Sequence, residues 1–198
     1  MRRPLVLLPV LLLLVAAVLV SPALAADVKI RVEGRTQTIF GAVQPGVRAG
    51  SALEALDVAS TTGEFHYALT TASFGAYVSQ IGKYAAGGSA GWVFKVNGIS
   101  PPVGADKVVL ADGDVVLWYY ATFGPTGGPP TLELQRLPAN CYLVQSVNDA
   151  GKRTRAAGAT LTVDGKRFRT REGRACIGRH TGLVRAVAPQ AIRSNAVR

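Results

Sequence analysis

The sequence predicts two small modules of different class, an α+β module followed by an all-β module. One capped helical segment lies among strand patterns in the first half, and only short strand patterns follow a Gly/Pro linker at residues 124–130. Charge divides at the same place. Residues 26–125 carry 7 basic and 8 acidic side chains, whereas residues 126–198 carry 13 and 4. We therefore expect a first module at 26–123 and a basic second module at 131–198.

Residues 1–25 have the layout of a secretory signal peptide. Arg2 and Arg3 precede an apolar run from Leu5 to Val20, and small residues up to Ala25 provide a cleavage site. The alternative is an uncleaved membrane anchor, although a spanning helix needs about 20 apolar residues and this run is shorter. We expect a secreted protein, extracellular or associated with the cell surface, that meets a membrane only if the signal segment is retained.

The first module begins with a strand and continues into a helix. Apolar residues from Val28 to Val32 alternate with charged residues, which is the period of a half-buried strand. Ser51 and Glu54 have the S-x-x-E spacing of a capping box, and Gly63 is placed to end the helix that follows. Residues 65–84 are expected to be extended but irregular.

The stretch from Gly91 to Ala121 carries aromatic strands and tight turns. Asn97-Gly98 is a preferred pair for a turn with positive φ. The strand predicted at residues 115–121 is apolar on both faces. Such a strand is either covered on both sides or presents an apolar surface to a ligand or partner.

Two motifs in this stretch carry a resemblance. G-W-x-F-x-V-N-G at 91–98 and L-x-D-G-D-V-x-x-W-x-Y at 110–120 resemble the transcobalamin-like C-terminal domain family, over roughly residues 26–123. The resemblance implies a β-grasp fold, a small mixed sheet wrapped around one helix, and binding of a soluble small molecule. The vitamin carriers pair this domain with a large α-helical barrel. This sequence shows no such domain, so we expect no cofactor, with cobalamin as the alternative that the resemblance suggests.

The second module contains both cysteines of the chain, Cys141 and Cys176. An even pair in an exported protein predicts a disulfide, and closing a loop of about 35 residues stabilises the fold by about 4 kcal/mol. Asp164-Gly165 predicts a hairpin turn. The segment from Gly158 to Gly178 resembles carboxypeptidase-regulatory or Ig-like modules. That resemblance implies a small antiparallel β-sandwich with a structural or adhesive role.

Four aromatic or apolar residues are the ligand-binding candidates: Trp92, Leu117, Tyr119 and Tyr120. Trp92 and Tyr120 lie on the strand face that is expected to pack on the helix, whereas Leu117 and Tyr119 lie on the opposite face. Any binding by residues 115–121 is therefore expected on the face of Leu117 and Tyr119.

A cluster of three arginines is the second candidate surface: Arg167, Arg169 and Arg171, called here the arginine cluster. Their alternate spacing puts them on one strand face, where they could contact an anionic polymer. The alternative is a solvated face. Phe168 is the one aromatic residue among them, and a single ring provides no stacking platform, so no nucleic-acid motif is indicated.

Catalytic and metal-binding motifs are not recognisable. The two histidines, His66 and His180, have no nucleophile motif around them, and the two cysteines lack metal-ligand spacing. We therefore predict a non-catalytic binding protein whose first module binds a small molecule or a cell-envelope component. The alternative is a structural or adhesive surface protein. An open apolar face on residues 115–121 would favour binding, and a strand covered on both faces would favour the structural role.

Overall fold

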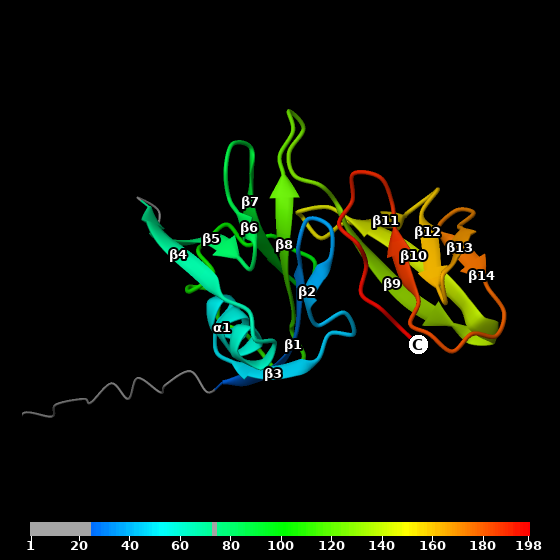
Figure 1. Ribbon diagram of the computed structural model, residues 1–198, viewed down its shortest axis with the longest axis horizontal. Helices are drawn as coiled ribbons and strands as arrows, with labels where there is room; N and C mark the ends of the chain where they lie inside the picture. Colours follow the sequence, from blue (N-terminus) through cyan, green and yellow to red (C-terminus); the bar gives the residue numbers. More distant parts are fainter. Residues whose placement is uncertain (1–24, 73–74) are drawn as a thin grey trace, which may run out of the picture.

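The structure is a computed structural model that describes residues 25–72 and 75–198 (Figure 1). The predicted signal peptide, apart from its last residue, lies outside the described residues. Within the described ranges, no helix has the length and apolar character needed to cross a membrane.

The main sheet of the first module has five strands. They are β1 (Ala26–Glu33), β2 (Thr38–Phe40), β3 (Gly46–Ala49), β7 (Ala90–Val96) and β8 (Val115–Thr122). Strand β1 is central: it runs parallel to β8 on one side, and on the other it pairs with β2 at one end and β3 at the other. Among the strands that the structure describes, β7 pairs with β8 alone, so it forms an edge of the sheet.

The helix α1 (Ala52–Thr62) covers one face of this sheet (Figure 1). Its predicted cap is confirmed, because Ser51 Oγ accepts a hydrogen bond from the Glu54 amide at 3.1 Å. The Glu54 carboxylate accepts one from the Gly50 amide at 2.8 Å. Buried Leu56 shares a core with Ile30 and Trp118 from the sheet. Tertiary packing therefore holds a helix that is too short to be stable alone.

Three strands that follow α1 form a separate antiparallel sheet. Its strands are β4 (Tyr67–Ala72), β5 (Gly75–Ile81) and β6 (Tyr84–Ala85). Val78 and Ile81 of β5 are buried in the same core as α1 and the main sheet.

The predicted α+β class with a β-grasp first module is wrong. Strands in several sheets dominate the described residues, and the 11-residue α1 is the single α-helix among them. The segment expected to be extended but irregular, 65–84, contains the paired strands β4 and β5, and Val109 makes an isolated bridge to Ser51. The chain is therefore better described as a sandwich-like all-β protein.

The second module consists of two antiparallel sheets that share one core. The first sheet contains β9 (Thr131–Leu137), β10 (Cys141–Val147), β11 (Arg153–Arg155) and β14 (Arg174–Cys176), with the 3₁₀ turn η1 (Pro138–Asn140) between β9 and β10. The second contains β12 (Thr160–Val163), β13 (Lys166–Arg169) and β15 (Arg185–Val187). Tyr142 and Val144 of one sheet meet Leu161 and Ala186 of the other in a buried layer.

The predicted local features of this module are confirmed. Cys141 and Cys176 are directly opposite each other on β10 and β14 and form a disulfide. Asp164 and Gly165 both have positive φ, 48° and 70°, in the turn between β12 and β13.

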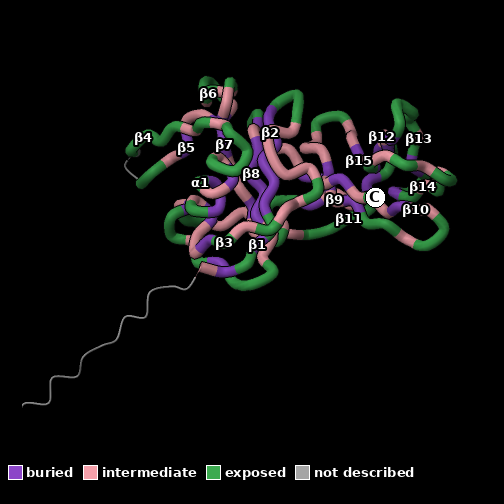
Figure 2. Tube along the Cα trace, turned by 60° about the horizontal axis from the view of Figure 1, so that its bottom comes forward, coloured by how far each residue is buried: buried purple, intermediate pink, exposed green. Residues whose placement is uncertain are grey.

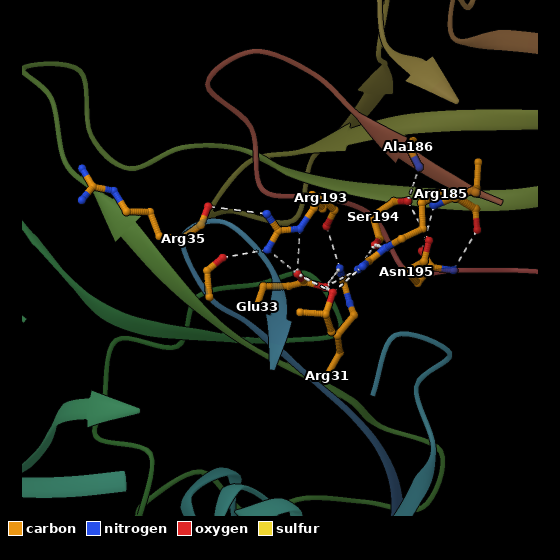
Figure 3. A network of polar contacts seen from close by, with 11 residues as sticks. Arg31, Glu33, Arg35, Arg185, Ala186, Arg193, Ser194 and Asn195 are labelled. Atoms are coloured by element: carbon orange, nitrogen blue, oxygen red, sulfur yellow. Dashed lines mark hydrogen bonds and ion pairs between the residues drawn. The ribbon is translucent and has the colours of Figure 1, made fainter. Parts of the chain in front are cut away.

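The two modules meet across a buried ionic cluster around Glu33 at the end of β1 (Figure 3). Its carboxylate binds Arg31 at 3.0 Å, Arg193 at 2.9 Å, and Arg185, whereas Glu33 itself is fully buried. Arg193 also donates to the Gly34 carbonyl at 2.7 Å. Because Arg185 and Arg193 belong to the second module, Glu33 connects the two modules directly. We call these four charged residues the Glu33 cluster.

A second buried contact lies on the same side of the sheet. Lys95 is fully buried, and its Nζ donates to the carbonyls of Val147 at 3.1 Å and Asn148 at 3.0 Å and pairs with Asp149 at 3.2 Å. Next to it, a small apolar core forms between the modules, from Leu117, Tyr119, Ala121, Val93 and Ile192. Strand β8 is consequently covered on both faces (Figure 2).

Candidate ligand-binding groove

An apolar groove of about 540 Å³ runs along the free edge of β7. One wall is β5, from Ala76 to Val78, and the other is the loop from Ser100 to Ala105. The groove is lined by Phe94 and Trp118 from one face of the sheet and by Val93 and Tyr119 from the other. Side chains of opposite faces can share a groove only where the sheet ends, which places the groove at its edge.

The aromatic residues of the groove form packed pairs. The rings of Phe94 and Trp118 stack with centroids 5.0 Å apart, and Trp92 packs edge-on against Tyr120 at 5.5 Å. Both indole N–H groups are bonded elsewhere in the fold: Trp92 donates to the Tyr84 carbonyl at 2.8 Å and Trp118 to that of Ala52 at 3.1 Å. The two indoles therefore offer the groove apolar surface.

Local sequence explains how the β5 wall approaches so closely. Gly91 faces the Tyr77 side chain, and a Cβ at this position would lie 2.3 Å from the tyrosine hydroxyl oxygen. A larger residue here would require the Tyr77 side chain to move, so glycine allows this wall to pack against β7 as it does.

The opposite rim is held at both ends. The Ser100 amide donates to the Asp149 carbonyl at 2.8 Å, and the Ala105 carbonyl accepts from the Leu53 amide at 3.1 Å. Between these anchors Val103 is 50% exposed, and Phe123 at the far end of the groove is 41% exposed. Large apolar side chains left in solvent around a hollow are typical of a binding surface.

The charged groups near the groove are paired. Asp149, at one end, is bound by Lys95, whose pKa is lowered by burial against the opposing effect of the Asp149 carboxylate. Tyr119 reaches the same end. Burial and the Asp149 charge raise the pKa of its hydroxyl well above the usual value, so the phenol is neutral. The groove thus suits an uncharged, largely apolar ligand.

The predicted ligand-binding residues divide among three places. Trp92 and Tyr119 line the groove, and Tyr120 borders a neighbouring, more polar hollow near residues 124–130. Leu117 is 7% exposed and lies in the core between the modules. Around Leu117, the face on which any binding by residues 115–121 was expected is therefore covered by the second module.

The groove rim was not recognised in the sequence. Val103 and Phe123 stand in loops, and no periodic pattern marks a loop residue as part of a site.

The other candidate residues lie outside the groove. The arginine cluster is exposed on and just beyond β13 of the second module (Figure 1). His66 contacts Gln80 at 3.3 Å, and His180 bonds the Tyr142 hydroxyl at 2.8 Å. Over the described ranges, no group of three or more His, Cys, Asp or Glu residues could hold a metal ion. That the protein is not an enzyme stays a prediction.

Comparison with known proteins adds one family match. Residues 46–122 match the family DUF4430, a domain of unknown function. Among solved structures, a protein from Ruminococcus gnavus ATCC 29149 that is provisionally described as metal-binding is similar at 16% identity and a TM-score of 0.37. The similarity covers 48% of this chain and 95% of that one. No curated protein matches.

Proposed function

We propose that this chain is an exported, non-catalytic binding protein whose first module takes an apolar small molecule or cell-envelope component in the β7 groove. The observation that carries the proposal is the groove itself: apolar walls, exposed Val103 and Phe123 at its rim, and charges that are already paired. The disulfide indicates an oxidising, extracellular environment and supports export. The resemblance to ligand-binding transcobalamin-like domains agrees with this function.

The experiment is native mass spectrometry of the protein purified from its own culture medium. We expect wild type to carry a non-covalent adduct, and Val103→Asp to lose it, because an unpaired carboxylate in the groove disfavours apolar binding. The matched control is Val109→Asp, since Val109 is 74% exposed and lies outside the groove. A bare mass for wild type under mild conditions would refute the proposal.

Both tryptophans of the chain line the groove, which gives a second measurement. A ligand that enters should change the intrinsic fluorescence of wild type and Val109→Asp but not of Val103→Asp. An equal change in all three would place the ligand elsewhere.

A second candidate function is a structural or adhesive surface protein. It is favoured by β8 being covered on both faces and by the buried contacts that join the modules. In this role the arginine cluster would contact an anionic polymer. Replacing its three arginines with Gln should lower the salt concentration that elutes the protein from immobilised dextran sulfate, whereas replacing exposed Arg48, Lys83 and Lys107 should not. Equal elution of both variants would exclude the cluster.

A further inference from the structure

We propose that the occupant of the β7 groove is an extended segment of a partner polypeptide, which adds to the main sheet as a strand beside β7. The inference rests on the proposed function and narrows its ligand to a peptide backbone. Strand addition of this kind uses main-chain hydrogen bonds for affinity and side-chain hollows for selectivity.

Two hydrogen bonds fix the pairing of β7 with β8. The Asn97 amide donates to the Val115 carbonyl at 2.9 Å at one end of the ladder, and the Phe123 amide donates to the Ser89 carbonyl at 2.8 Å at the other. In an antiparallel pair, hydrogen-bonded and non-bonded positions alternate. The bonds at both ends of the pairing involve odd-numbered residues. The odd-numbered residues of β7 therefore direct their N–H and C=O groups toward β8.

The even-numbered residues Trp92 and Phe94 direct their main-chain groups the other way, into the groove. Within the described parts of the chain, no hydrogen bond satisfies these two N–H and two C=O groups. They repeat every second residue, about 6.6 Å apart along the strand. An incoming extended peptide presents donors and acceptors with the same repeat, whereas a compact apolar molecule has no such array.

Tight turns close both ends of this open edge. Ala90 pairs back with Gly87, and Val96 pairs back with Ile99. The free part of the edge is thus limited to the residues that face the groove. A short extended segment fits this length.

The edge also lacks the usual protection against pairing. Edge strands are commonly guarded by outward charges, proline or a bulge. In β7 the one charged residue, Lys95, is fully buried against Asp149, and the strand contains no proline and pairs with β8 in unbroken register. An unguarded edge beside an apolar groove favours a specific occupant.

The walls of the groove favour a slender occupant over a second copy of the chain. Because β5 and the rim around Val103 both line the groove beside β7, a folded sheet edge must fit between them to reach Phe94. Because the charges near the groove are paired, the segment should be neutral where it lies against β7. We expect alternating apolar, β-branched residues, which suit an extended conformation.

The test uses the full secreted protein and the probe peptide acetyl-Lys-Thr-Val-Thr-Val-Thr-Lys-amide. Two further versions of the peptide carry N-methyl groups. In one version the amides of both valines are methylated, and in the other the amides of all three threonines are methylated. Because alternate residues point their N–H groups to opposite sides, only one version should lose binding, by about tenfold or more, as followed by tryptophan fluorescence. Amide exchange measured by NMR should slow for Trp92 and Phe94 on peptide addition, while Val93 stays unchanged.

The outcomes separate the two proposals. Strand addition is refuted if both N-methylated peptides bind like the parent and the amides of Trp92 and Phe94 are not protected from exchange. The proposed function still stands in that case if wild type binds a ligand that Val103→Asp does not bind. If neither the peptide nor any apolar molecule binds, both fail. Protection of Phe94 that rises with protein concentration alone, together with a dimer in analytical ultracentrifugation, would identify a second copy as the occupant and overturn the partner assignment.

Discussion

Replacing Glu33 with Gln tests whether the Glu33 cluster joins the two modules. Glu33 is fully buried and accepts hydrogen bonds from Arg31, Arg185 and Arg193. Gln keeps the size and one acceptor oxygen but removes the one negative charge among three guanidinium groups. This environment already disfavours the charged form of Arg31, because burial lowers its pKa to about 10 in spite of the Glu33 charge.

The expected loss of stability follows from charge burial. Removing one partner of a buried ion pair costs about 3–5 kcal/mol, because the other charge remains without compensation. For a chain of this size each kcal/mol lowers Tm by about 2–4 °C, so the variant should melt roughly 6–20 °C below wild type.

The assay is urea unfolding followed by tryptophan fluorescence, with thermal unfolding as a second measure. The control is Glu172→Gln, because Glu172 is exposed and pairs loosely with Arg155 at 3.7 Å, so little change is expected. Adding Arg31→Met to Glu33→Gln should restore part of the loss, since Arg31 is buried and its Nε has no hydrogen-bond partner among the described residues. A Glu33→Gln protein as stable as its control would refute the argument.

Three further predictions concern the interface, the disulfide and export. Burial and, second to it, the Asp149 charge raise the pKa of the Tyr119 hydroxyl in the folded protein. An unfolded tyrosine titrates at about pH 10, so the unfolded chain releases this proton at a lower pH than the folded protein does. The stabilising contribution of the neutral Tyr119 hydroxyl is therefore complete below about pH 10 and is lost as the pH rises further. Tyr119→Phe should reduce this loss of unfolding free energy in urea titrations at increasing pH. An unchanged pH dependence would contradict the prediction. Reduction of Cys141–Cys176 should add two hydrogens to the intact mass and cost about 4 kcal/mol, whereas free thiols before reduction would exclude the bond in the secreted protein. The secreted protein should begin near Ala26; a chain that starts at Met1 would indicate a retained anchor.

Local chemistry was the predictable part of this fold. The Ser51 cap and the turn at Asn97-Gly98, with φ of 53° and 86°, follow from residues whose preferences are set by near neighbours. The disulfide follows from an even pair of cysteines in a chain with an export signal. Each depends on a few residues, or on one pair of cysteines and the export signal, and needs no knowledge of the fold.

The arrangement of the modules depends on contacts that no local pattern contains. In β1, Arg31 and Glu33 occupy the charged positions of an alternating pattern, which predicts a solvent face. They are buried because Arg185 and Arg193, more than 150 residues away in sequence, cover that face. One signal was present: the strand at 115–121 is apolar on both faces, and cover on both sides was one of the two alternatives that this pattern left open.

The groove escaped prediction for a related reason. It depends on which strand lies at the edge of the sheet, and strand order is a property of topology. Trp92 was a candidate because of its residue type, whereas the free main-chain groups beside it could be found only once β7 was seen to pair on one side.

The central position of β1 has a practical consequence for dividing this protein. The family match begins at residue 46, after β1, although β1 is the strand on which β8, β2 and β3 all pair. A fragment cut to the matched residues would lose the middle of its sheet. A fragment of residues 26–123 would retain β1 but expose Leu117, Tyr119 and buried Lys95 to water. The second module covers the face of the main sheet that carries these three residues, so the two modules are best produced and assayed together.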